Sequence, residues 1–185
     1  MNIPNAITLF RIVLIPVFIG IFYLPQAWAL PLATFIYWLA SISDWFDGYL
    51  ARKLNQQSAL GAFLDPLADK LMVIIALVLL VARHPDNIWL VGSSLIIIAR
   101  EIIVSSLREW MAAQGKSEQV AVSFAGKAKT VGQMFAILFL IYEKDLFGMP
   151  TFVLGTGLLV WAALLTILSM LVYLQSAWAT IKRSS

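Results

Sequence analysis

Residues Asp44–Asp69 read DWFDGYLARKLNQQSALGAFLDPLAD, and this stretch decides how the rest of the chain can be arranged. It joins the ends of two strongly apolar segments, yet it contains four carboxylates, at Asp44, Asp47, Asp65 and Asp69. An ionised carboxylate within an apolar segment is costly and usually functional, because it needs a cation to neutralise it. We therefore expect a cation site in this stretch.

Helical spacing places these acids beside small side chains. On helices that advance about 100° per residue, intervals of three and four residues put each pair of acids on one face with glycine or alanine. The two sets are Asp44, Asp47, Gly48 and Ala51, and Gly61, Asp65 and Asp69. The polar connection Arg52–Ser58 would fold the helices into an antiparallel pair with all the acids at one end. A bulky ligand could approach there.

The donor set favours a hard cation. Oxygen ligands select Mg²⁺ or Mn²⁺, and the absence of cysteine argues against a zinc site. Two ions held by shared carboxylates are a common device for binding phosphate oxygens, so we expect metal-assisted phosphoryl chemistry. In the alternative, the acids form helix-end salt bridges with Arg52, Lys53 or Lys70. That alternative explains one aspartate more easily than four beside glycine and alanine.

The composition is that of a membrane protein. Of the 185 residues, 61% are hydrophobic and 12% are charged, and the mean hydropathy is +0.88. Such values are rare in soluble domains. Six apolar runs approach the length of about 20 residues that crosses a bilayer: Ala6–Leu24, Leu30–Leu50, Leu60–Ala82, Asn87–Met111, Phe124–Tyr142 and Thr151–Ile181. We predict an all-α integral membrane protein with six transmembrane helices in a single domain, residues 1–185.

Lysine and arginine residues indicate the orientation. With six spans, both termini and the second and fourth connections share one side. That side collects Arg52, Lys53, Arg108, Lys116, Lys127, Lys129, Lys182 and Arg183. The opposite connections contain only Arg83 and Lys144. We expect both termini and the acids to face the cytoplasm, in the inner membrane of a bacterium.

The acidic stretch resembles the signature of a known family. The pattern D-x2-D-G-x2-A-R-x8-G-x3-D-x3-D of the CDP-alcohol phosphotransferases matches Asp44, Asp47, Gly48, Ala51, Arg52, Gly61, Asp65 and Asp69. The resemblance implies a membrane enzyme with six transmembrane helices, usually a homodimer. Such an enzyme uses a divalent metal to displace CMP from a CDP-linked substrate by an alcohol.

Further stretches resemble one group of family members. They are NIPNAITLFR at residues 2–11, AREIIVSSLRE at residues 99–109 and GKAKT at residues 126–130. The members that they resemble use CDP-diacylglycerol and sn-glycerol 3-phosphate and form phosphatidylglycerophosphate and CMP. We expect the same two substrates here.

The resemblance also implies roles for individual residues. Asp44, Asp47 and Asp65 would be metal ligands, and Asp69 would be a metal ligand and the general base for the attacking hydroxyl. The expected CDP-lipid site comprises Gly48, Ala51, Arg52, Gly61, Asn5 and Thr8. Arg52 either binds phosphate or braces the neighbouring helix, and helix capping would explain Asn5 equally well.

A phosphorylated acceptor needs cations beside the metal site. Arg100, Arg108, Lys127 and Lys129 lie on the expected cytoplasmic side, and the two lysines begin the fifth helix, whose free N–H groups attract anions. We assign these four residues to the acceptor phosphate. The alternative is that they are ordinary positive-inside residues, or that Arg100 pairs internally with Glu101 or an aspartate.

Two other functions are compatible with the sequence. A sister enzyme would use serine, inositol phosphate or a second lipid as acceptor. A cation transporter would line its ion path with the intramembrane aspartates, although these cluster toward one side of the predicted bundle. No feature indicates a nucleic-acid partner.

Overall fold

The structure is a computed structural model that describes the backbone of residues 3–54, 59–113 and 124–184. Within these ranges it describes the side chains of residues 8–43, 64, 67–68, 70–107, 109–111 and 129–171. This part of the chain forms six helices: α1 (Ile3–Phe22), α2 (Ala29–Leu54), α3 (Ala59–Arg83), α4 (Ile88–Ala113), α5 (Phe124–Tyr142) and α6 (Thr151–Ser184). Each helix corresponds to one predicted apolar run, so the all-α prediction is confirmed.

The helices end where the sequence supplies stop and start signals. Helix α3 ends at Arg83, two residues before Pro85, and the side chain of Asn87 then caps α4 by accepting a hydrogen bond from Leu90 N at 3.1 Å. Helix α5 is followed by Glu143, whose φ of 56° lies in the left-handed region that often ends a helix. Helix α6 begins directly after Pro150, and proline suits the start of a helix because it has no N–H to leave unpaired there.

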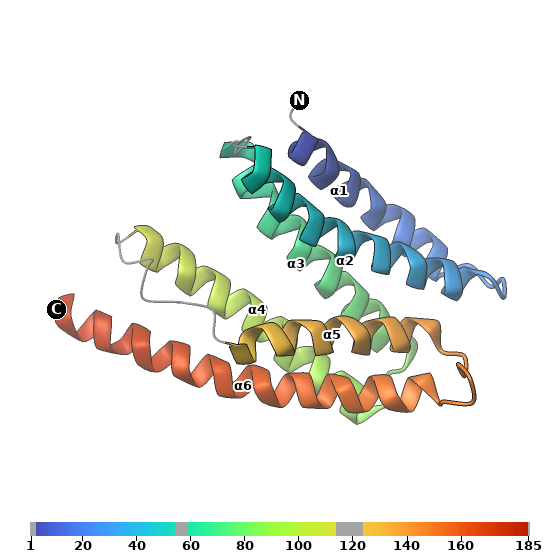
Figure 1. Cartoon of the computed structure of the whole chain (residues 1–185). Coiled ribbons are helices and arrows are strands. Elements are labelled where there is room, and N and C mark those ends of the chain that lie inside the picture. Colours follow the sequence, from blue (N-terminus) through green and yellow to red (C-terminus); the bar gives the residue numbers. More distant parts are fainter. Residues whose placement is uncertain (1–2, 55–58, 114–123, 185) are drawn as a thin grey trace.

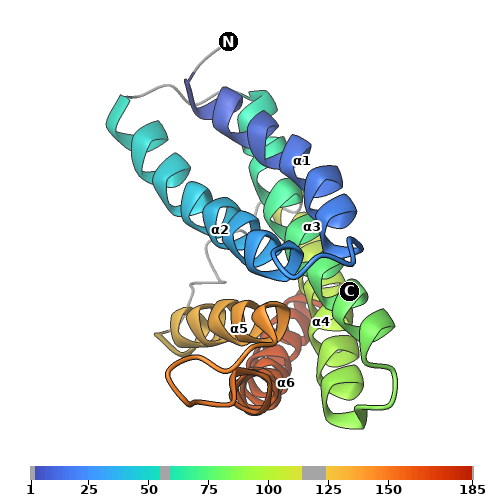
Figure 2. The ribbon, with the colours of Figure 1, turned by 90° about the vertical axis from the view of Figure 1, so that its right-hand side faces the viewer.

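The six helices form two groups of three. Helix α1 packs against α2 and α3, whereas α6 packs against α4 and α5. The α2–α5 and α3–α4 contacts join the two groups, which lie one above the other in Figures 1 and 2. In Figure 1 the start of α1 and the end of α6 lie toward the same end of the bundle, together with the end of α2 and the start of α3.

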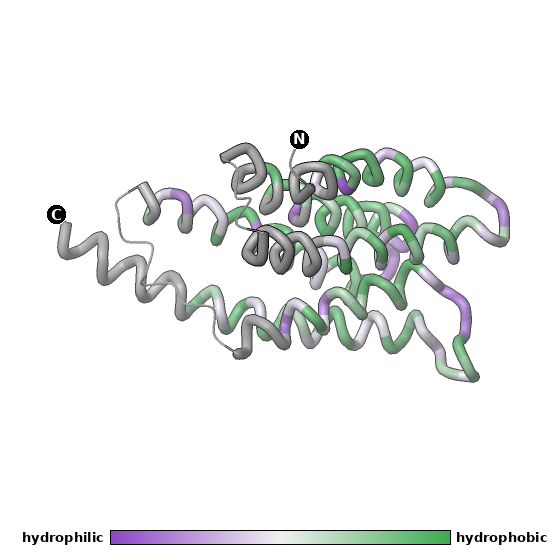
Figure 3. Tube along the Cα trace, turned by 45° about the horizontal axis from the view of Figure 1, so that its top comes forward, coloured by the Kyte–Doolittle hydropathy of each residue, from purple (hydrophilic) through white to green (hydrophobic). Residues whose placement is uncertain are grey.

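The outer surface of the bundle is apolar, and its helix contacts use small residues. Figure 3 shows mostly hydrophobic helices, with hydrophilic residues gathered mainly at the connections. Val13, Ile88 and Val153 are 60%, 77% and 66% exposed, whereas Ala76 and Ala136 are fully buried. Small residues at helix contacts and large apolar residues outside are the pattern of a protein surrounded by lipid.

Helix length and composition agree with a membrane location. Judged on the described residues, Ile88–Met111 and Thr151–Leu171 are long and apolar enough to cross a membrane. The shorter apolar segments are Thr8–Phe22, Ala29–Ser43 and Lys129–Tyr142. Even α5, with 19 residues, is about 28 Å long, close to the hydrocarbon thickness of about 30 Å. The count of six membrane spans stays a prediction.

Polar contacts tie the connections together at the end of the bundle opposite the acidic stretch. Glu143 Oε1 lies 2.7 Å from both Arg83 Nε and His84 Nε2, so the residue after α5 holds the end of α3. Lys144 Nζ donates a hydrogen bond to the carbonyl of Ala27 at 2.9 Å, which adds the α1–α2 connection. Three connections are thereby joined at this end.

Candidate active site

The backbone brings the two halves of the acidic stretch together. Asp44 and Asp47 lie in the last part of α2, and Asp65 and Asp69 lie in the first half of α3. Helices α2 and α3 contact each other, and the end of α2 and the start of α3 lie at the same end of the bundle in Figure 1. This is the helix pair that the sequence predicts. The four carboxyl groups themselves lie outside the described side chains, so their arrangement stays a prediction.

The small residues expected beside the acids are also placed only by their backbone. Gly48, Ala51 and Arg52 belong to α2, and Gly61 belongs to α3. Their surroundings also lie outside the described part of the structure. The structure shows that both segments are helical, and the shared faces were predicted on the assumption that they are.

The start of α1 differs in one respect from the sequence prediction. Helix α1 begins at Ile3, so Asn5 is already its third residue and the capping role considered for Asn5 is wrong. The side chain of Asn5 lies outside the described residues. Thr8 is fully buried, and Arg11, one helical turn later, is only 1% exposed. A buried guanidinium in an apolar helix is a functional signal.

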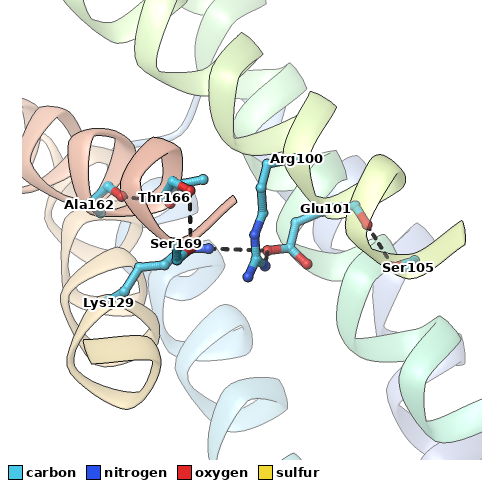
Figure 4. A network of polar contacts seen from close by, with 7 residues as sticks. All are labelled: Arg100, Glu101, Ser105, Lys129, Ala162, Thr166 and Ser169. Atoms are coloured by element: carbon cyan, nitrogen blue, oxygen red, sulfur yellow. Dashed lines mark hydrogen bonds and ion pairs between the residues drawn. The ribbon is translucent and has the colours of Figure 1, made fainter. Parts of the chain in front are cut away.

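Two of the four predicted acceptor residues meet around one carboxylate. Arg100 and Glu101 lie on α4, and Lys129 reaches them from α5, as Figure 4 shows. Arg100 Nη1 is 2.6 Å from Glu101 Oε1, and Lys129 Nζ is 3.5 Å from the same oxygen. The internal pair of Arg100 with Glu101 that the sequence left open is therefore present, and Lys129 shares it.

The other two predicted acceptor residues are placed only by their backbone. Arg108 lies on α4, about two helical turns after Arg100. Lys127 precedes Lys129 on α5 by two residues, a step of about 200° around a helix, so the two lysines occupy different faces. Neither Arg108 nor Lys127 has a described side chain, and their roles stay predictions.

The Arg100–Glu101–Lys129 cluster is enclosed, and in it two cations share one carboxylate. The side chains of Arg100, Glu101 and Lys129 are 14%, 21% and 3% exposed. Arg100 Nε is buried and has no hydrogen-bond partner within the described part of the chain. Guanidinium groups bind phosphate through several N–H groups at once, which makes Arg100 a candidate ligand for an oxyanion.

Helix α6 contributes hydroxyl groups near this cluster that are satisfied within their own helix. Thr166 Oγ1 donates to the carbonyl of Ala162 at 2.6 Å, and Ser169 Oγ donates to the carbonyl of Thr166 at 3.0 Å. On α4, Ser105 Oγ donates to the carbonyl of Glu101 at 2.6 Å. The protons of these three hydroxyl groups are therefore used within their own helices (Figure 4).

An apolar bundle of helices, an eight-position acidic signature and a cationic cluster on neighbouring helices agree with one class of protein. The chain belongs to the CDP-alcohol phosphatidyltransferase family, whose model matches residues 1–179. Among curated proteins it is similar to the CDP-diacylglycerol–glycerol-3-phosphate 3-phosphatidyltransferase of Salmonella typhimurium, with 49% identity over 95% of this chain and 94% of the relative. It is 48% identical to the protein of the same name from Escherichia coli over 96% of both chains.

Proposed function

We propose that this protein transfers the phosphatidyl group from CDP-diacylglycerol to sn-glycerol 3-phosphate, which yields phosphatidylglycerophosphate and CMP. The observation that carries this proposal is the identity of 48–49%, over at least 94% of both chains, to relatives named for this reaction. The complete acidic signature and the Arg100–Glu101–Lys129 cluster are the local features that support it.

The four aspartates fit divalent metal ions. Their donor set consists only of carboxylate oxygens on two contacting helices, which suits Mg²⁺ or Mn²⁺. Asp44, Asp47, Asp65 and Asp69 would hold two ions. When bound, such ions neutralise diphosphate oxygens and stabilise the charge that develops on the leaving CMP.

The reaction needs one proton transfer and one displacement. Asp69 accepts the proton of the primary hydroxyl of glycerol 3-phosphate, and the hydroxyl oxygen attacks the phosphorus that bears the lipid. The new P–O bond forms while the bond to the CMP oxygen breaks, and CMP leaves with that electron pair. No serine, cysteine or histidine accompanies the acids in Asp44–Asp69 apart from Ser58 in the connection, so direct displacement is favoured over a covalent enzyme intermediate.

The acceptor phosphate binds to the cluster on α4 and α5. Arg100 offers a planar set of donors and Lys129 offers an ammonium group, and both contact the same oxygen of Glu101. Arg108, about two helical turns along α4, and Lys127, on another face of α5, are further candidates to bind the phosphate. The CDP-lipid would lie with its nucleotide near Asn5, Thr8, Gly48, Ala51, Arg52 and Gly61.

The membrane arrangement follows from the same proposal. All six helices of the described part would cross the inner membrane of a bacterium, as one domain with both termini and the acids at the cytoplasmic side. The apolar exterior and the excess of lysine and arginine at that side support this orientation. We also propose a homodimer, as the family resemblance implies.

The test is release of CMP from CDP-diacylglycerol by the purified protein in detergent with Mg²⁺. Release that requires sn-glycerol 3-phosphate, with phosphatidylglycerophosphate as product, is the expected result. Release only with serine, inositol phosphate or a lipid alcohol would place the protein with the sister enzymes. If no alcohol supports release, metal flux into vesicles would test the transporter instead.

A further inference from the structure

We propose that Glu101 is a positioning residue of the acceptor site, which holds Arg100 and Lys129 at one point between α4 and α5. Through these cations it sets the affinity for the acceptor's phosphate. The inference rests on the proposed function, because that function defines the acceptor. It assigns a role in phosphate binding to a carboxylate, although a negative charge does not itself bind phosphate.

One oxygen atom organises the cluster. Glu101 Oε1 lies 2.6 Å from Arg100 Nη1 and 3.5 Å from Lys129 Nζ, so both cations are directed to a single point. Adjacent residues on a helix point about 100° apart and do not normally face each other. The guanidinium of Arg100 is therefore turned toward Glu101, which is also where Lys129 arrives from α5 (Figure 4).

The enclosure of the cluster gives the carboxylate its importance. Lys129 is 3% exposed and Arg100 is 14% exposed, so neither cation is well hydrated. Two like charges at low dielectric repel each other strongly unless an anion lies between them. Without Glu101 the two cations would lose the carboxylate that they share, and we expect the two side chains to separate and lose their common direction.

Glu101 leaves donors available for a phosphate. It accepts from Arg100 through Nη1, whereas the buried Nε of Arg100 has no hydrogen-bond partner among the described residues. The guanidinium also has further N–H groups, which can bind a phosphate monoester without displacing the carboxylate. Glu101 therefore holds Arg100 in place and does not compete with the phosphate for the remaining N–H groups.

The test compares kinetic constants of E101Q and E101D with those of the unchanged enzyme. Glutamine keeps the shape and loses the charge, so E101Q should raise the KM for sn-glycerol 3-phosphate about tenfold or more, as expected for an interaction with a charged group. We expect kcat to change less than about threefold and the KM for CDP-diacylglycerol to stay the same. E101D keeps a carboxylate and should recover part of the loss.

A matched control and a double variant sharpen the comparison. Glu109 lies on the same helix, eight residues later, and is exposed, so E109Q should leave both KM values unchanged. In a K129Q background, E101Q should have a smaller effect than in the unchanged protein, because Glu101 then holds Arg100 alone. Effects that simply multiply would overturn the proposed coupling.

Other outcomes would also overturn the inference. A lower KM for glycerol 3-phosphate in E101Q would mean that Glu101 competes with the phosphate. Equal losses in kcat, in both KM values and in thermal stability would mean a purely structural role, and E101D would decide the matter if E101Q did not fold. If the unchanged protein releases no CMP with glycerol 3-phosphate, the proposed function fails first. Normal activity with an unaltered KM in E101Q refutes this inference alone.

Discussion

The contact between α5 and α6 is so close that one added methyl group should be measurable. A Cβ atom on Gly155 would lie 2.9 Å from Leu140 Cγ, 3.0 Å from the carbonyl oxygen of Ala136 and 3.1 Å from Leu140 N. Two of these neighbours are backbone atoms, which cannot rotate away. Because carbon atoms rest about 3.5–4.0 Å apart, Gly155→Ala requires α5 and α6 to separate by roughly 0.5–1 Å.

The same helix offers a matched control for this change. A Cβ atom on Gly157 would have nothing within 4 Å. Both substitutions gain the same helix propensity, up to about 1 kcal/mol, so this gain cancels in the comparison. Over-packing costs about 1–3 kcal/mol, and Gly155→Ala should be less stable than Gly157→Ala by this amount. Gly132→Ala should lie between them, because the three atoms nearest to its Cβ would all belong to the Trp161 side chain, the closest at 2.6 Å.

The assay is thermal loss of helicity for the three purified variants in one detergent. Activity should be measured as well, since α5 carries Lys129, and a displaced α5 should raise the KM for glycerol 3-phosphate in the proposed reaction. The reasoning is refuted if Gly155→Ala unfolds at the same temperature as Gly157→Ala or above it. That result would mean that α5 and α6 do not approach as closely as the Gly155 contact requires.

Three further predictions concern the reaction and the opposite end of the bundle. Asp69→Asn should lower kcat by about 10²–10⁴-fold, the usual contribution of a general base, while CDP-diacylglycerol still binds in a competition assay; parallel loss of binding would indicate a metal-ligand role. EDTA should abolish CMP release and added Mg²⁺ or Mn²⁺ should restore it, whereas activity that survives exhaustive chelation would contradict the metal site. Glu143→Ala removes the partner of Arg83 and His84, and Glu143→Gly removes it too but relieves the positive φ of 56°. The glycine variant should therefore be more stable by about 1 kcal/mol in thermal unfolding, and equal stability would argue against backbone strain at Glu143.

Much of the fold follows from the sequence because local signals agree. The apolar runs and the breaks at Pro85 and at Gly148–Pro150 place the helices, and the predicted run Phe124–Tyr142 coincides with α5. The acidic pair of helices was equally predictable, because residues at intervals of three and four share a face on a helix.

The acceptor cluster was only partly predictable. The sequence assigns Arg100 and Lys129 to the same phosphate, but it offers no reason for Lys129 to contact Glu101, which lies 28 residues away on another helix. Such a contact depends on how α4 and α5 are arranged around α6, and helix arrangement is not encoded in local spacing. The close approach at Gly155 and the burial of Arg11 depend on tertiary packing in the same way.

The division of the bundle into two groups has a consequence for acceptor choice in the proposed reaction. The acids lie on α2 and α3, whereas Arg100 and Lys129 lie on α4 and α5. The acceptor must reach from the cationic cluster to the attacked phosphorus with its hydroxyl about 3–3.5 Å from that atom. The span of the acceptor is then set by the α2–α5 and α3–α4 contacts that join the groups. Selectivity for a short phosphorylated alcohol would thus come from the spacing between two groups of helices, and substitutions at these contacts should change which alcohol is accepted before they abolish turnover.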